Sequence, residues 1–166
     1  MKLKDILKNI EILKIRGDDE IEVGGICLSS KQVNLNDTFV AVSGGNLDGH
    51  DYIDSAIESG ATVIVLEKLP KELKERITYV QVENTKETLG QLAKNFYENP
   101  SSKLKLVGVT GTNGKTTTVT LLHQLFSLLG YKAGLISTIA DKAGKEILKR
   151  NSDTPTTPDV IDINRM

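Results

Sequence analysis

The chain has 166 residues, 39% of them apolar, which suffices for one ordinary globular domain or two small ones. Its 21 basic and 22 acidic residues nearly cancel and only 4% of residues are aromatic, so the composition excludes the basic surface typical of DNA- and RNA-binding proteins. The single cysteine, Cys27, cannot form an intrachain disulfide and has no metal-ligating companions, which favours a cytoplasmic location.

The first part of the chain alternates predicted helices and strands. Leucine and isoleucine recur at helical spacing over residues 2–14, which predicts an amphipathic opening helix, and the charges between them exclude a signal peptide or membrane span. Helices are also expected at 51–60 and from a capping box at Asn84 and Glu87 to about Tyr97. Short segments rich in β-branched residues predict strands at 38–43, 61–66 and 78–83.

The segment PSSK, residues 100–103, is a plausible domain boundary. Beyond it the pattern predicts a strand at 104–109, a helix at 116–129 and a strand at 132–138. This order predicts a βαβ unit with parallel strands, whose ligand would lie at the carboxyl end of the first strand.

The segment GVTGTNGKTTT, residues 108–118, lies at that end and looks like a phosphate-binding loop with one changed position. The pattern Gly-x4-Gly-Lys-[Ser/Thr] requires glycine at position 109, which is Val109 here. Gly111 and Gly114 nevertheless permit positive φ and close backbone approach, so successive N–H groups can surround an anion. The following helix adds its unpaired N–H groups and the positive end of its dipole.

Side chains add to this anion site. Lys115 brings a positive charge to the outer phosphates, and the hydroxyl of Thr116 can join the shell of a Mg2+ ion that bridges phosphate oxygens. Thr110, Thr112 and Thr117 are further possible donors. The alternative is a glycine-rich strand-to-helix turn with an incidental lysine.

The loop resembles the ATP-binding loop of the Mur ligases, the ATP-dependent amide ligases of peptidoglycan precursor synthesis. In this family the loop commonly reads Gly-[Thr/Ser]-x-Gly-Lys-[Thr/Ser], so the shifted glycine is a family feature. The string GTNGKTT is most similar to the tripeptide synthetases of the family, which add the third residue of the stem peptide. The resemblance implies ATP and Mg2+ as cofactors. The implied ATP-binding residues are Gly111, Thr112, Asn113, Gly114, Lys115, Thr116 and Thr117, with Thr116 as the Mg2+ ligand.

A second stretch, residues 33–53, resembles the N-terminal domain of the same ligases, which holds the uridine end of the UDP-sugar substrate. The implied substrate-binding residues are Leu28, Ser30, Gly45, Asn46 and Leu47. Where the family reads Asp-Ser-Arg the chain reads Ser-Ser-Lys, and Lys31 cannot reproduce the bidentate fork of an arginine. The alternative for GGNLDGH is a turn-rich loop, in which His50 is a turn or capping residue. His123, in the predicted helix after the loop, is interpreted as a packing or surface residue.

A third stretch, DTPTTPDV at residues 153–160, resembles the Thr-Thr-Pro element that meets the muramoyl-peptide part of the substrate. It makes Thr156 and Thr157 candidate ligands for polar groups of that substrate. Together the resemblances imply an α/β protein with a small N-terminal UDP-sugar-binding domain, residues 1–99. Residues 100–166 would then begin a central P-loop ATPase domain with a Rossmann-like parallel sheet.

The reaction implied by the resemblance is amide ligation. ATP activates the free carboxylate of UDP-N-acetylmuramoyl-L-alanyl-D-glutamate as an acyl phosphate, which the amino group of a diamino acid attacks. The sequence leaves open whether this is meso-diaminopimelate or L-lysine. Positioning and charge neutralisation carry such chemistry, and no residue of the chain is assigned as catalytic.

Because the family has three domains and the resemblance covers most of residues 26–160, the chain is expected to be an N-terminal portion without ligase turnover of its own. Two alternatives stay open. One is another amide ligase with this loop, of the folylpolyglutamate or cyanophycin synthetase type, against which the string FVAVSGGNLDGH argues. The other is a non-catalytic nucleotide-sugar-binding module.

Overall fold

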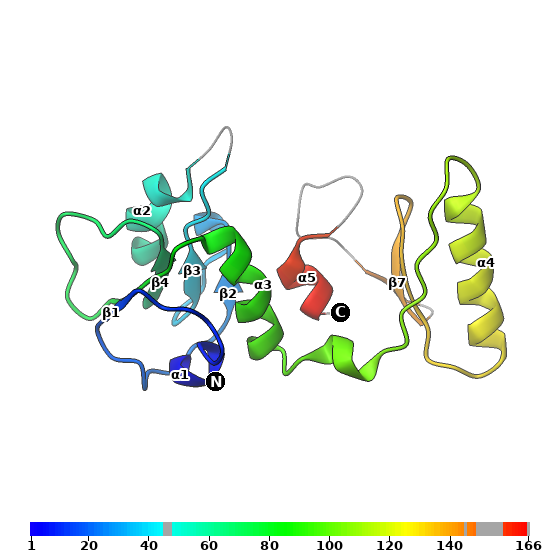
Figure 1. Cartoon of the computed structure of the whole chain (residues 1–166), viewed down its shortest axis with the longest axis horizontal. Helices are drawn as coiled ribbons and strands as arrows, with labels where there is room; N and C mark the ends of the chain where they lie inside the picture. Colours follow the sequence, from blue (N-terminus) through cyan, green and yellow to red (C-terminus); the bar gives the residue numbers. More distant parts are fainter. Residues whose placement is uncertain (45–47, 145, 149–157, 166) are drawn as a thin grey trace. The chain divides into compact units, whose positions relative to one another are not determined.

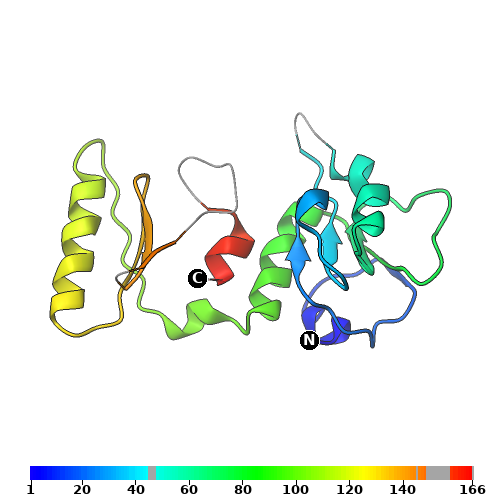
Figure 2. The same cartoon turned by 180° about the vertical axis from the view of Figure 1, so that it is seen from behind.

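The computed structural model describes residues 1–44, 48–144, 146–148 and 158–165, which Figures 1 and 2 show from opposite sides. The chain divides into two compact units, Met1–Pro100 and Ser101–Met166. None of the helices in the described ranges is long and apolar enough to cross a membrane.

The first unit is built on a mixed sheet that is dominated by parallel pairs. Among the described residues it has five strands in the order β1-β5-β4-β3-β2. Strands β2, β3, β4 and β5 pair in parallel, and β1 pairs antiparallel with β5. The strands are β1 (Lys14–Arg16), β2 (Ile26–Cys27), β3 (Thr38–Val40), β4 (Val63–Leu66) and β5 (Thr78–Gln81). The three strands predicted at 38–43, 61–66 and 78–83 are therefore confirmed, each shorter than its prediction.

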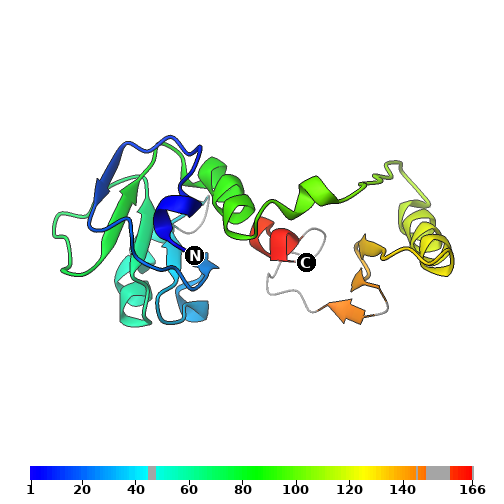
Figure 3. The ribbon, with the colours of Figure 1, turned by 90° about the horizontal axis from the view of Figure 1, so that it is seen from below.

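Helices cover both faces of this sheet, with α1 (Leu3–Ile6) and α3 (Thr85–Phe96) on one face and α2 (Ile53–Glu58) on the other (Figure 3). Every side chain of β4 is fully buried. On the α2 side a core cluster forms around Phe39, Ile64 and Tyr79. A strand covered on both faces has to be apolar throughout, which explains the continuous run VIVL in β4.

The predicted opening helix over residues 2–14 is wrong in extent, because α1 ends at Ile6. Asn9 adopts a φ of 60°, which no α-helix continues through. The chain then enters β1, where Ile15 pairs with Val80. The edge of β5 offers hydrogen bonds to the backbone of β1. This long-range pairing cannot be seen in the helical spacing of the apolar residues.

The predicted cap of α3 by Asn84 is confirmed, and the predicted return contact from Glu87 is made to the Asn84 side chain instead of its backbone N–H. The Asn84 Oδ1 atom accepts hydrogen bonds from the backbone N–H groups of Lys86, at 3.0 Å, and Glu87, at 3.1 Å. In return the Asn84 amide donates to the Glu87 carboxylate at 2.9 Å. The N–H of Thr85 is taken by the carboxylate of Glu67, which follows β4, at 3.0 Å. The first turn of α3 is thus anchored both locally and to the sheet.

The second unit has a different architecture from the one predicted. Its described residues form α4 (Lys115–Leu128), α5 (Val160–Arg165) and an antiparallel sheet of β6 (Gly134–Ile136), β7 (Asp141–Ala143) and β8 (Glu146–Leu148). The predicted helix at 116–129 is confirmed as α4, and the predicted strand at 132–138 corresponds to β6. Residues 104–109 were predicted as a strand but belong to no sheet.

The predicted parallel βαβ unit is therefore not present among the described residues of the second unit. Leu106, in the middle of the expected strand, is 93% exposed. A parallel sheet needs neighbouring strands and cover on both faces, and the described residues after α4 provide only an antiparallel partner for β6.

Removal of the Asn84 cap should destabilise α3. We expect Asn84→Ala to lower the free energy of opening α3 by about 1 kcal/mol, because two first-turn N–H groups lose their acceptor. Native-state hydrogen exchange of the α3 amides measures this change. Lys86→Ala, an exposed substitution in the same turn, is the matched control, and equal protection in the two variants would contradict the prediction.

The contribution of Glu67 to stability should depend on pH. Hydrogen bonds from the backbone N–H and then the hydroxyl of Thr85, and from the hydroxyl of Ser43, lower the pKa of Glu67. Because the folded pKa is depressed, this stabilisation is complete above the unfolded value, about 4.3, and is lost as pH falls through the folded pKa.

We therefore expect Glu67→Gln to reduce α3 protection at pH 7, and the difference from the unsubstituted chain to shrink toward pH 4. Hydrogen exchange at the two pH values, corrected for the intrinsic exchange rates, checks this. A difference of the same size at both would show that the charge of Glu67 is irrelevant.

Candidate functional site

The loop before α4 has positive φ angles at Gly111 and Gly114, as the sequence predicts. Gly111 has a φ of 150° and Gly114, which precedes the first residue of α4, has a φ of 78°. A Cβ atom added at Gly114 would meet nothing within 4 Å. Gly114 is therefore required by backbone conformation and not by crowding, and the space beside it is open to a ligand.

Lys115 turns its side chain back over this loop. Its Nζ atom donates hydrogen bonds to the carbonyl oxygens of Gly111 and Thr112, the second at 3.2 Å. The ammonium group consequently lies beside the loop backbone at the N-terminus of α4, where helix N–H groups are unpaired. A phosphate oxygen bound there could replace either carbonyl as its acceptor.

Two threonine hydroxyl groups meet at the first turn of α4. The Oγ1 atoms of Thr116 and Thr138 lie 3.4 Å apart, although 22 residues separate them. Thr138 belongs to a turn after β6 in which Ser137 braces Ala140: the Ser137 hydroxyl donates to the Ala140 carbonyl at 2.9 Å and accepts from its N–H at 3.2 Å. Sequence reasoning missed Thr138, since only the fold brings it beside Thr116.

The chemistry of these hydroxyl groups is compatible with a magnesium site, which phosphate oxygens would have to complete. Oxygen donors suit Mg2+, which commonly keeps several waters and binds few protein ligands when phosphates are present. Within the described ranges, no three histidine, cysteine, aspartate or glutamate side chains gather as a metal site. The other predicted ATP-binding residues, Thr112, Asn113 and Thr117, are exposed around the loop.

The described candidates for the UDP-sugar, Leu28 and Ser30, lie in the first unit, after the carboxyl end of β2. Leu28 and Ser30 follow β2, and the segment from Ser43 to Asp48 follows β3. These strands are parallel neighbours, so both segments leave the same edge, where ligands of open α/β sheets bind. Gly45, Asn46, Leu47, Thr156 and Thr157 lie outside the described residues.

Hydrogen bonds tie the segment after β3 to the sheet. Ser43 and Asp48 form an isolated antiparallel bridge. His50 follows in a 3-10 turn whose cap is the Asp48 carboxylate, and the imidazole Nε2 atom accepts from the Glu67 N–H at 3.1 Å. The backbone N–H and the imidazole of His50 lower the pKa of Asp48. The interpretation of His50 as a turn residue agrees with this geometry, but its contact with Glu67 was not foreseen.

Cys27 is not a reactive thiol in this fold. Its Sγ atom donates a hydrogen bond to the buried carboxylate of Asp37 at 3.3 Å. Burial, followed by this contact, raises the pKa of Cys27 to about 12. The thiol therefore stays protonated at neutral pH and is a poor nucleophile.

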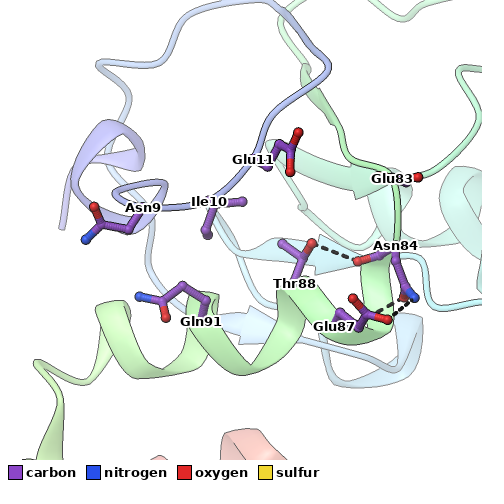
Figure 4. Close-up of a pocket in the computed structure, with 8 residues that line it drawn as sticks. All are labelled: Asn9, Ile10, Glu11, Glu83, Asn84, Glu87, Thr88 and Gln91. Carbon is purple, nitrogen blue, oxygen red and sulfur yellow. Dashed lines mark hydrogen bonds between the residues drawn. The ribbon is translucent and has the colours of Figure 1, made fainter.

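A hollow of about 500 Å³ lies between α3 and the chain that leads into β1 (Figure 4). None of the predicted site residues line it. Its walls include the carboxylates of Glu11, Glu83 and Glu87, and the last already accepts a hydrogen bond from Asn84. Three carboxylates disfavour a phosphate, so this hollow is not the nucleotide site.

Two protein-family models match consecutive parts of the chain. Residues 22–97 match the description "Mur ligase family, catalytic domain" and residues 109–166 match "Mur ligase middle domain". Among solved structures, a UDP-N-acetylmuramoyl-L-alanyl-D-glutamate–2,6-diaminopimelate ligase aligns with 99% of this chain and 32% of its own, at a TM-score of 0.69 and 20% identity, which supports the fold alone. MurF ligase from Thermotoga maritima, in complex with ADP, is 39% identical over 68% of this chain and 24% of its own, at a TM-score of 0.50.

A curated relative extends the likeness to the whole chain. UDP-N-acetylmuramoyl-L-alanyl-D-glutamate–2,6-diaminopimelate ligase of Bacteroides fragilis is 49% identical over all 166 residues. The chain spans 34% of the length of that relative. Two consecutive domain matches and this identity show that the chain belongs to the Mur ligase family.

Proposed function

We propose that this chain provides the nucleotide-sugar-binding region and part of the ATP-binding region of an ATP-dependent ligase. The ligase would add a diamino acid to UDP-N-acetylmuramoyl-L-alanyl-D-glutamate. The observation that carries the proposal is the loop from Gly111 to Thr116, with its two positive-φ glycines and a lysine at the start of α4. The Bacteroides fragilis relative is named for diaminopimelate, which favours diaminopimelate over lysine here.

The two regions would divide the work between substrate and ATP. Residues 1–99 would hold the uridine end of the UDP-sugar, and residues 100–166 would begin the domain that binds ATP. Half-buried Leu28 and buried Ser30 are suited to packing and hydrogen bonding against a uracil ring. The proposed substrate-binding residues are Leu28, Ser30, Gly45, Asn46, Leu47, Thr156 and Thr157.

The chemistry would proceed by phosphoryl transfer from ATP to the D-glutamate carboxylate. The resulting acyl phosphate loses inorganic phosphate when the amine attacks, and an amide bond forms. The loop N–H groups and Lys115 would hold the phosphates and balance their charge. Mg2+ would supply further charge neutralisation, held by the Thr116 hydroxyl and phosphate oxygens. The Thermotoga maritima ligase is in complex with ADP, which supports an adenine nucleotide as a ligand of the proposed enzyme.

Other assignments receive less support. A folylpolyglutamate or cyanophycin synthetase has no UDP-sugar to bind, whereas the whole chain resembles ligases that are named for one. A non-catalytic nucleotide-sugar module would bind the UDP-sugar without binding ATP.

The half-buried thiol of the single cysteine fits the reducing cytoplasm, where we propose that the protein acts.

The uridine side of the proposal is tested at Ser30. We expect the chain to bind UDP-N-acetylmuramoyl-L-alanyl-D-glutamate in titration calorimetry, and Ser30→Ala to weaken this binding about tenfold through the loss of one hydrogen bond. Ser55→Ala, at an exposed position of α2, is the matched control. An unsubstituted chain that ignores the UDP-sugar would refute the proposed substrate class.

The ATP side is tested at Lys115. Lys115→Ala should weaken Mg-ATP binding by the chain at least about tenfold, because a charge-assisted hydrogen bond to phosphate is lost. Lys132→Ala removes an exposed lysine beyond the other end of α4 and should leave the affinity unchanged. If the chain binds the UDP-sugar but not ATP, the non-catalytic module becomes the better assignment.

A further inference from the structure

One buried carboxylate holds both ends of the segment that follows β2. Asp37 directly precedes β3 and is only 4% exposed. Its Oδ2 atom accepts hydrogen bonds from the backbone N–H of Asn34, at 2.8 Å, and from the thiol of Cys27, at 3.3 Å. Cys27 is the last residue of β2, so residues 28–33 lie between two points that are attached to the same oxygen.

The enclosed segment contains a short 3-10 turn, Ser30–Gln32. The carbonyl oxygen of Gln32 accepts from the Asn34 side-chain amide at 3.3 Å and lies 3.5 Å from the Cys27 sulfur. Val33, which follows the turn, is buried in the core cluster on the α2 side of the sheet. The turn is therefore held by the core and by the two residues that Asp37 binds, all of them within the described part of the chain.

The surroundings of the Asp37 carboxylate leave it little room to move. A Cβ atom on Gly25 would lie 2.8 Å from Oδ1, and one on Gly24 would lie 3.2 Å from it. The Asp37 N–H donates to the Asn34 carbonyl at 3.2 Å, and the Thr38 N–H donates to the Gly25 carbonyl at 2.8 Å. A carboxylate so far removed from water depends on its hydrogen-bond donors, because a buried charge without them is costly. Burial therefore enforces the contacts of Asp37 with its donors.

We propose that Asp37 is a positioning residue for the uracil end of a uridine nucleotide, an inference that rests on the proposed function. Asp37 does not touch the nucleotide itself. It fixes the turn that begins with Ser30, and it fixes Cys27, to which Leu28 is directly bonded. Leu28 and Ser30 are the two proposed uridine ligands that the structure describes. The nucleotide then binds to a turn whose ordering cost was met during folding.

Two substitutions of Asp37 separate the acceptor from the rest of the side chain. Asp37→Asn keeps an oxygen that can accept from Asn34 and Cys27, whereas Asp37→Ala has none. We expect Asp37→Ala to weaken UDP binding by the 166-residue chain about tenfold, and Asp37→Asn to stay within about threefold of the unsubstituted chain. Titration calorimetry with UDP measures the affinities, and thermal unfolding shows whether each variant is folded. Leu35→Ala, in the same connection but 75% exposed, is the matched control and should bind UDP unchanged.

A double variant shows whether Asp37 acts through the turn. Ser30→Ala alone should weaken UDP binding about tenfold, as expected for the UDP-sugar. If Asp37 serves to place Ser30, its removal costs little more once the Ser30 hydroxyl is gone. We therefore expect Ser30→Ala with Asp37→Ala to lose about tenfold in affinity, whereas independent effects would multiply to about a hundredfold.

The contact between Asp37 and Cys27 is tested independently of binding. Burial, followed by the hydrogen bond and the negative charge of Asp37, raises the pKa of Cys27 to about 12. Asp37→Asn removes the charge, so the pKa of the thiol should fall and the reactive thiolate fraction should grow. Because the chain has a single cysteine, its alkylation by iodoacetamide at pH 8.5 reports on this thiol alone. We expect the folded variant to react at least about threefold faster than the unsubstituted chain.

If Asp37→Ala does not fold, two substitutions of Cys27 decide instead. Cys27→Ser keeps a donor for the Asp37 carboxylate, whereas Cys27→Val has a similar size and no donor. We expect Cys27→Val to bind UDP at least about threefold more weakly than Cys27→Ser.

The outcomes distinguish this inference from the proposed function. If the unsubstituted chain binds neither UDP nor the UDP-sugar, the proposed function fails and the inference fails with it. If the chain binds UDP and folded Asp37→Ala binds it equally tightly, the inference alone is overturned. Multiplying losses in the double variant, equal affinities of Cys27→Val and Cys27→Ser, or unchanged alkylation of Asp37→Asn would overturn it as well.

Discussion

The first unit depends on the burial of β4 on both faces. All four of its side chains are inaccessible to solvent, so α2 has to cover one face while α1 and α3 cover the other. Parallel neighbours on both sides satisfy its backbone. The connections are thereby forced to the ends of the strands, and the segments after β2, β3 and β4 emerge together at one edge. The candidate uridine site is a consequence of this arrangement.

The edge is then organised by polar contacts from residues that follow the strands. Glu67 comes directly after buried β4, and its backbone and carboxylate reach Ser43, His50 and Thr85. Such contacts cost little where strands end, because the groups remain partly accessible, yet they fix the segments relative to the rigid sheet. The same rigidity lets a small unit, with helices on both faces of its sheet, hold these segments at the edge where the uridine site is proposed.

The second unit shows what happens without such a central strand. Residues 104–109 are mostly apolar but belong to no sheet, and α4 carries exposed apolar side chains such as Leu121 and Leu128. The loop before α4 still has its glycine conformations, because these depend on local backbone sterics and on the start of one helix. The backbone conformation of this loop therefore does not depend on the predicted parallel sheet.

The sequence by itself determined the features whose causes are local. The capping box of α3, the Gly111 and Gly114 conformations, the position of Lys115 at the start of α4 and the three β-branched strands follow from neighbours within a few residues. The motifs around them were also sufficient to indicate the Mur ligase family. Only the tertiary structure decided the rest. Residues 14–16, part of the predicted opening helix, form β1 by pairing with the edge of β5, and residues 104–109 pair with no strand among the described residues. The contacts between His50 and Glu67 and between Thr116 and Thr138 join residues 17 and 22 positions apart, and no local pattern encodes distances that the packing of whole elements sets.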